Sequence, residues 1–187
     1  MNALALVTAL SLAGGPRVEG LVNAKDSLGS LNGFSVTVDL DDGAARAGIA
    51  SRAISTQIEA ALRRSGVHVY RYAGNEVTND PGTPGKEGQV EIAIVALTGS
   101  VGAEPFTAVR YDVVVSQWVH LEADPTAAAF ARTWMEGGVL TAPRNQVAGV
   151  VREALAPALD KLCADYVSAR AYWLARQRAS AATGRSE

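Results

Sequence analysis

A long alternation of apolar and polar residues over positions 109–121 limits the folds open to this chain. Valine, tyrosine and leucine occupy nearly every second position on one side. The other side carries Arg110, Asp112, Ser116, Trp118 and His120, with Val114 among them. A period of two residues is typical of a β-strand with one face on a core and the other facing outward. The chain is therefore expected to contain a sheet with two unlike faces.

Shorter alternations predict further strands at residues 34–40, at 67–69, from Val90 onward, and at 130–135. Ile49, Ile54, Ile58 and Leu62 recur at near-helical spacing, and Ser65-Gly66 follows as a glycine helix stop. Loops are expected at residues 79–88 and 98–105 and at Asp124-Pro125, and Gly137-Gly138 is expected to end the fifth strand.

A second, longer helix is expected from Asn145, with an apolar stripe along one side. The stripe consists of Val147, Val151, Leu155, Leu159, Leu162 and Tyr166. Pro157 is expected to kink this helix, because proline removes a backbone donor. The helix is expected to fray after Trp173.

The resulting order β-α-β-β-β-β-α predicts an α+β fold. We expect a two-layer sandwich, in which two helices cover one face of a mostly antiparallel sheet of about five strands. The 187 residues suit one domain with tails. Residues 14–33 are expected to be a linker or arm, 34–173 the single α+β domain, and 174–187 a polar tail.

The N-terminal residues 3–13 form an apolar run that is too short to span a bilayer, which needs about 20 residues. Small residues, Ser11 and Ala13, stand at the −3 and −1 positions before Gly14, as at a signal-peptide cleavage point. The positive charge that usually precedes such a run is missing. A cleaved signal peptide, an uncleaved hydrophobic anchor and a buried helix therefore remain open. The first predicts a periplasmic or extracellular location, and the second predicts membrane association.

Charge and cysteine content exclude several kinds of partner and site. The net charge of −2 provides no basic field for nucleic acid. The single cysteine, Cys163, excludes an intrachain disulfide and a site built from several thiolates.

Motifs of catalysis or cofactor binding fail on inspection. An EF-hand beginning at Asp39 would need oxygen ligands where Gly43 and Ala50 stand. A phosphate-binding loop at Gly85-Lys86 would need glycine at position 80 and serine or threonine at position 87. Only two histidines, His68 and His120, are available for a triad, and no nucleophile-elbow motif is present. The sequence thus predicts no catalytic, cofactor-binding or metal-binding residue.

Aromatic residues on the outer side of the sheet are the candidates for partner contact. We expect such a contact to centre on Trp118, with His120 and Trp134 nearby. Alternatively, the N-terminal arm covers Trp118 and Val114. The C-terminal end carries Arg170, Arg176, Arg178 and Arg185, with Tyr172 and Trp173 among them. This end is either a solvated helix end or a peripheral contact with anionic lipid or an acidic partner.

Three segments, residues 55–69, 111–121 and 131–138, together resemble a group of bacterial exported proteins of unknown function. In that group a helix and an apolar strand precede a long strand and a Thr-Trp pair, matched here by Thr133-Trp134. The resemblance covers about residues 34–170. It implies an envelope or extracellular setting and no assigned activity.

We therefore expect a non-enzymatic accessory or binding subunit of the bacterial cell envelope, with an envelope protein or membrane complex as its partner. The alternative is a small enzyme whose site, built from Asp112, His120 and Arg132, assembles only in the fold on the outer sheet face. A purely structural role, including self-association through a sheet edge, is the third possibility.

Overall fold

The computed structural model describes residues 24–70, 87–101, 104–121 and 124–183. Two short helical turns, α1 (Ala24–Ser27) and η1 (Leu28–Ser30), precede β1 (Gly33–Leu40), α2 (Asp42–Arg46) and α3 (Ser51–Arg64). The strands β2 (His68–Val69), β3 (Glu87–Val101), β4 (Glu104–Leu121) and β5 (Asp124–Pro143) lead to the long helix α4 (Val147–Thr183). The expected leader, residues 3–13, and most of the expected loop 79–88 lie outside the described residues.

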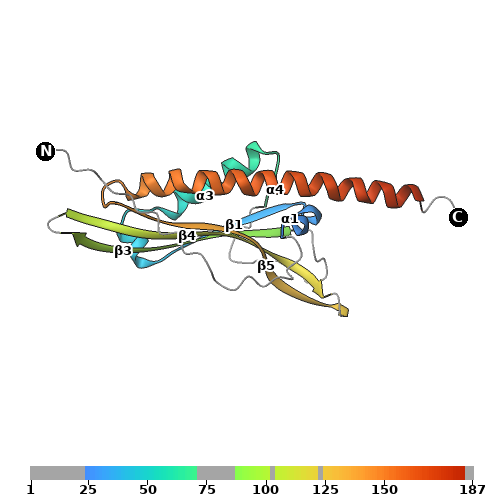
Figure 1. Cartoon of the computed structure of the whole chain (residues 1–187), viewed down its shortest axis with the longest axis horizontal. Coiled ribbons are helices and arrows are strands. Elements are labelled where there is room, and N and C mark those ends of the chain that lie inside the picture. Colours follow the sequence, from blue (N-terminus) through green and yellow to red (C-terminus); the bar gives the residue numbers. More distant parts are fainter. Residues whose placement is uncertain (1–23, 71–86, 102–103, 122–123, 184–187) are drawn as a thin grey trace.

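The α+β class and the five strands are confirmed, and Figure 1 shows both long helices, α3 and α4, above the sheet. The sheet is mixed, with the order β2-β1-β3-β4-β5. β1 runs parallel to both β2 and β3, whereas β3, β4 and β5 are antiparallel neighbours. The assumption that turns join consecutive strands correctly predicted the antiparallel pairing of β3, β4 and β5. It missed that β1 lies between β2 and β3 and runs parallel to both, which requires crossover connections instead of tight turns.

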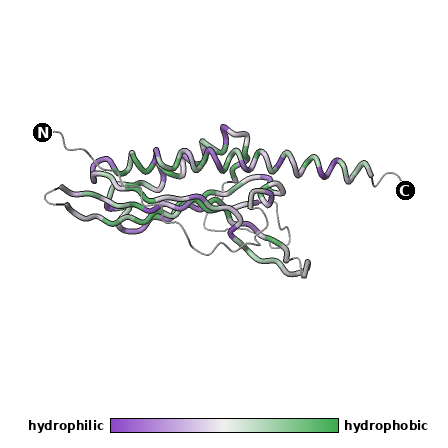
Figure 2. The backbone as a smooth tube through the Cα atoms, in the orientation of Figure 1, coloured by the Kyte–Doolittle hydropathy of each residue, from purple (hydrophilic) through white to green (hydrophobic). Residues whose placement is uncertain are grey.

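The core lies between the inner sheet face and the apolar stripes of α3 and α4, where Figure 2 shows many hydrophobic residues. Its largest fully buried side chains include Phe34, Ile54, Ile58, Leu62, Ile92, Leu155, Leu159 and Leu162. Gly66 follows α3 with a φ of 72°, which confirms the expected glycine helix stop.

The short segment before β1 also belongs to the core. Leu28 and Leu31 are fully buried. The Tyr166 hydroxyl of α4 donates a hydrogen bond to the Leu31 carbonyl at 3.0 Å. The last ten residues of the expected linker thus include two core leucines that pack against the middle of α4.

Two loop predictions were wrong. β3 and β4 stay paired as far as Val101 and Glu104, inside the segment expected to be a loop. Gly137 and Gly138 do not end β5, which continues to Pro143. A Cβ on Gly137 would lie 2.6 Å from the Tyr111 carbonyl oxygen, so this glycine permits close strand contact instead of marking a turn.

Helix α4 runs through Pro157 as one continuous helix, in contrast to the expected kink (Figure 1). Pro157 is exposed, as is Glu153, whose carbonyl would otherwise receive a hydrogen bond from position 157. Water can satisfy that carbonyl on the exposed side. The helix also continues ten residues past Trp173, to Thr183.

The acidic segment after β1 has a structural role. The Asp41 carboxylate accepts hydrogen bonds from the backbone N–H groups of Ala44, at 2.7 Å, and Ala96, at 3.1 Å. The first bond caps the N-terminus of α2. The second bond satisfies a backbone N–H of β3 just beyond the point where the pairing of β1 with β3 ends.

Candidate interaction site at the projecting hairpin

The β4–β5 hairpin extends beyond the rest of the sheet. β3 pairs with β4 only as far as Gly88 and Gln117. Residues 118–121 of β4 and 124–130 of β5 therefore form a two-stranded ribbon that leaves the body of the molecule (Figure 1). We call these residues the projecting hairpin. An isolated two-stranded ribbon is marginally stable in water, so its side chains merit inspection for a role other than packing.

Trp118 and Phe130 form a pair on the outer side of the projecting hairpin. The two residues are opposite in the β4–β5 register, and their rings meet edge to face with centroids 5.5 Å apart. The preceding residue, Gln117, points the other way, because its side-chain amide donates to the Ser27 carbonyl and the Thr133 hydroxyl. Phe130 is 42% exposed.

Within the described part of the chain, the indole N–H of Trp118 is buried and has no hydrogen-bond partner. A buried donor without an acceptor costs roughly 1–3 kcal/mol, and most buried polar groups in folded proteins are paired. The free chain thus has an unpaired donor beside an exposed aromatic ring. An arriving carbonyl or carboxylate would remove this cost only if the atoms that now cover the N–H move aside.

The side chain of Trp134 does not lie beside that of Trp118. Trp134 is opposite Val115, a core residue, and is only 6% exposed. Its indole N–H donates to the Asp165 carboxylate of α4 at 3.0 Å, and Lys161 lies 6.0 Å from its ring. The two tryptophans therefore lie on opposite faces of the sheet.

The third residue of the expected contact, His120, is opposite Ala128 in the projecting hairpin, and its side chain lies outside the described part. Sequence reasoning could not place these residues, because register across a hairpin with two irregularities is not visible in the pattern.

Exposed apolar residues elsewhere on the outer face were missed. Val95 and Leu97 on β3, and Met135 and Val139 on β5, are all exposed. The strand end wrongly expected at 137–138 accounts for Val139 alone. The signal was present in β3, where residues 92–97 are continuously apolar instead of alternating. Val114, expected on an exposed patch, is 3% exposed.

The outer-face residues of the alternative enzymatic site do not converge. Asp112 accepts a hydrogen bond from Arg110 at 2.9 Å. Arg132 is opposite Ser116, four positions along β4 from Asp112, which separates the two by about 13 Å. Within the described ranges, no group of three or more histidine, cysteine or acidic side chains is arranged to hold a metal ion.

Cys163 is also unsuited to catalysis. The thiol is buried and donates to the Ala61 carbonyl at a sulfur–oxygen distance of 3.8 Å. Burial raises the pKa of the Cys163 thiol, which keeps it protonated at neutral pH.

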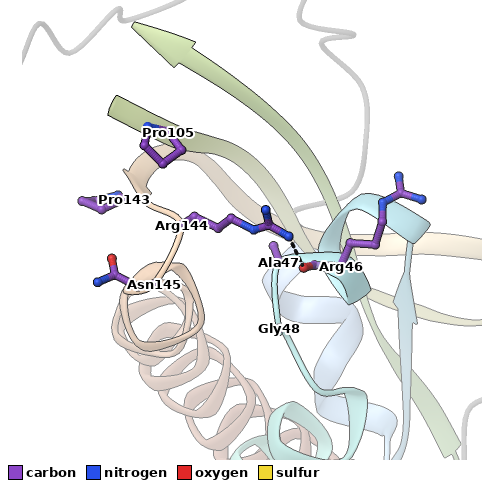
Figure 3. A pocket seen from close by; sticks show the side chains of 7 residues that line it. All are labelled: Arg46, Ala47, Gly48, Pro105, Pro143, Arg144 and Asn145. Atoms are coloured by element: carbon purple, nitrogen blue, oxygen red, sulfur yellow. Dashed lines mark hydrogen bonds between the residues drawn. The ribbon is translucent and has the colours of Figure 1, made fainter. Parts of the chain in front are cut away.

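A shallow pocket of about 540 Å³ lies at the end of the sheet opposite the projecting hairpin (Figure 3). It is lined by Arg46, Ala47, Gly48, Pro105, Pro143, Arg144 and Asn145. Arg144 donates to the Arg46 carbonyl at 3.4 Å, and Figure 3 shows the Arg46 guanidinium pointing away from that of Arg144. The two cations therefore do not converge on one anion.

The last turns of α4 project from the body beside the hairpin end of the sheet (Figure 1). Arg170 is engaged with the body through the Gly29 carbonyl and Asn32. No residue from Ala171 through Ala182 is buried. Arg170, Arg176 and Arg178 are spread roughly 80–160° apart around the helix axis. They form no single cationic face that would suit a lipid surface.

No family model and no curated protein matches this sequence. Among solved structures, the chain is similar to one described as a neuraminyllactose-binding hemagglutinin homolog from Helicobacter pylori. The TM-score is 0.40 and the identity 9%, over 79% of this chain and 90% of that chain. At this similarity, function must be argued from the chain's own residues. No helix among the described residues is both long and apolar enough to cross a membrane.

Proposed function

We propose that this protein is a non-enzymatic binding subunit that contacts a protein partner through the projecting hairpin. The observation that carries the proposal is the Trp118 indole N–H, buried and unpaired, next to the exposed ring of Phe130. Tryptophan is among the residue types that dominate interface energies when an interface buries them. A hairpin outside the core can present them without disturbing the sheet.

The geometry also indicates the chemistry of the partner surface. An apolar recess would receive the Phe130 ring. When the side chains that cover the Trp118 N–H move on binding, a backbone carbonyl or a carboxylate at the rim would pair with it. Since Trp118 and Phe130 already hold each other edge to face at 5.5 Å, little side-chain entropy is lost when they bind.

We further propose that the subunit acts in the bacterial cell envelope, outside the cytoplasmic membrane. Support comes from the apolar run at residues 3–13 and the small residues before Gly14. The intact mass of protein purified from its native source tests this part. A chain beginning at Gly14 in the periplasmic fraction is expected, and a chain beginning at Met1 in the cytoplasm would contradict it.

The binding role is tested by purifying the full chain with its native partner. Trp118→Ala and Phe130→Ala should each lower the amount of bound partner at least tenfold, because each removes half of the aromatic pair. Tyr172→Ala is the matched control, since Tyr172 is an exposed aromatic residue on α4, outside the hairpin. Undiminished partner in both hairpin variants, with each variant still folded, would reject the proposal.

A further inference from the structure

The edge of β5 is a second feature that the proposed function does not use. β5 is the last strand in the sheet order and has 20 residues. Within the described ranges, no strand pairs with its other side. The outward backbone N–H and C=O groups of such an edge are a template for another strand.

Natural edge strands usually carry features that discourage pairing, such as lysines, prolines and bulges. In β5 the prolines stand near its two ends, at Pro125 and Pro143. Its irregularity opposite Val115 and Ser116 leaves residues 134–142 in regular pairing with β4. The only charge in this regular part is Glu136, which is engaged by Lys161 of α4. The regular part therefore carries one such feature, the inward-pointing charge of Glu136, and Lys161 offsets that charge.

The outer side chains of this regular part are apolar. Met135 is 63% exposed and Val139 is 74% exposed, with Gly137 between them. Such residues on an edge strand gain free energy when they meet apolar neighbours on an added strand. The edge thus offers apolar contacts together with backbone pairing.

We propose that a second copy of this chain pairs with β5 antiparallel, about a twofold axis at Gly137, so that two five-stranded sheets become one of ten strands. In this register Met135 of each copy is opposite Val139 of the other. Gly137 is opposite itself, and Glu136 is opposite Gly138. The register joins exposed apolar residues and places no charges of the same sign opposite each other.

Neighbouring registers are less favourable. An axis at Glu136 would set the two Glu136 carboxylates opposite each other. An axis at Gly138 would place Met135 opposite Thr141 and Val139 opposite Gly137, which separates the two apolar residues. Registers shifted by one position would pair outer with inner side chains. The self-complementarity about Gly137 therefore favours a second copy as the occupant.

The proposed dimer leaves the projecting hairpin free. Phe130 lies beyond the regular part of β5, and the twofold axis sends the two hairpins away from each other. The dimer and the proposed binding role therefore succeed or fail independently.

The mass in solution tests the dimer first. Light scattering of the full chain across a dilution series should give twice the 19.4 kDa of one chain at high concentration. Val139→Lys should restore the single-chain mass, because it places two ammonium groups in the shared face. Leu97→Lys is the matched control and should remain dimeric, since Leu97 is 73% exposed on β3, away from the edge. A wild-type chain of single mass throughout would overturn the proposal.

Disulfide formation between copies tests the register. Met135→Cys and Val139→Cys chains are mixed and oxidised. The mixed pair should cross-link, because opposite residues of antiparallel strands have Cα atoms about 4.5–5.5 Å apart, within disulfide range. Met135→Cys alone should not, because two copies of that position would be about 13 Å apart. The wild-type chain, whose Cys163 is buried, is the background control. The proposed register would be overturned if one variant alone cross-linked as much as the mixture, or if the mixture did not cross-link.

Discussion

The two tryptophans of the β4–β5 hairpin, Trp118 on β4 and Trp134 on β5, lie in contrasting surroundings. Trp134 is packed under α4, nearly fully buried, with its N–H bonded to Asp165. Trp118, opposite the first part of β5, is on the projecting hairpin with its N–H unpaired. The same group, an indole N–H, thus stabilises the fold at Trp134 and costs free energy at Trp118. This difference is what the proposed contact role of the hairpin requires.

Helix α4 repeats this contrast along its own length. From Val147 to Ala169, its inner stripe belongs to the core cluster. Beyond Ala169 the described residues of the helix are exposed or half-buried. If the comparison is correct, equal substitutions in the two halves must have unequal effects on stability.

The largest difference is expected between two leucines of α4. Leu162→Ala should lower the free energy of unfolding by about 2–5 kcal/mol, since the side chain is fully buried and its removal leaves a cavity. Leu174→Ala, on the projecting half, should change it by roughly 0.5 kcal/mol or less. Urea unfolding of both variants provides the measurement. Similar losses would contradict the division of the helix.

The two tryptophans provide a test with a smaller expected effect, which depends on one hydrogen bond. Trp134→Phe should destabilise the protein by about 1.5–3 kcal/mol, because it removes a hydrogen bond to a carboxylate. Trp118→Phe should be close to neutral or stabilising in the free chain, since it removes a buried donor without a partner while the smaller ring buries less apolar surface. Thermal unfolding measured side by side separates the two. A loss at Trp118 equal to that at Trp134 would mean that the hairpin is part of the body.

High pH should weaken the body through Tyr166. Burial raises the pKa of the Tyr166 phenol above its ordinary value of 10.0, although Arg170 acts in the opposite direction. The folded state therefore favours the neutral phenol, which donates to the Leu31 carbonyl. Its contribution to stability is fully present below pH 10 and is lost as the pH rises through the raised pKa.

Unfolding measured at neutral pH and at alkaline pH, for wild type and Tyr166→Phe, checks this prediction. The variant should lose less stability at alkaline pH than the wild type does. A part of the loss should remain, because burial and the charge of Glu136 also raise the pKa of Tyr111. Identical pH dependence of stability in both proteins would mean that Tyr166 does not contribute to the loss at alkaline pH.

The smallest effect is expected when the chain is shortened before Leu174. None of residues 174–182 is buried, so the free energy of unfolding should fall by less than about 1 kcal/mol. Circular dichroism should show the loss of about ten helical residues without a change in the urea midpoint. A large shift in the midpoint would show that this segment supports the body.

The sequence alone predicted the α+β class, the apolar stripe of α4 and the helix stop at Gly66, because each depends on local periodicity or on one glycine. It could not predict that β1 separates β2 from β3, since order in a sheet depends on crossings between distant segments. The glycines at 137–138 were misread because close contact with Tyr111 and a turn both require glycine.

For the candidate site, the pattern correctly placed Trp118 on the outer side of its strand, but it grouped Trp134 with it. The face of Trp134 depends on the register opposite Val115 and on the irregularity at Thr133, neither of which the sequence shows. The unpaired state of the Trp118 N–H is a property of three-dimensional packing alone.

The most direct test of the hairpin as a contact surface is photocross-linking at position 130 in the native cell. Phe130 is replaced by a photoreactive phenylalanine analogue, and the same analogue replaces Leu97 as a control of higher exposure. The account predicts one discrete cross-linked partner from position 130, lost when Trp118→Ala is added, and none of the same mass from position 97. No adduct at position 130, or the same adduct from both positions, would contradict it.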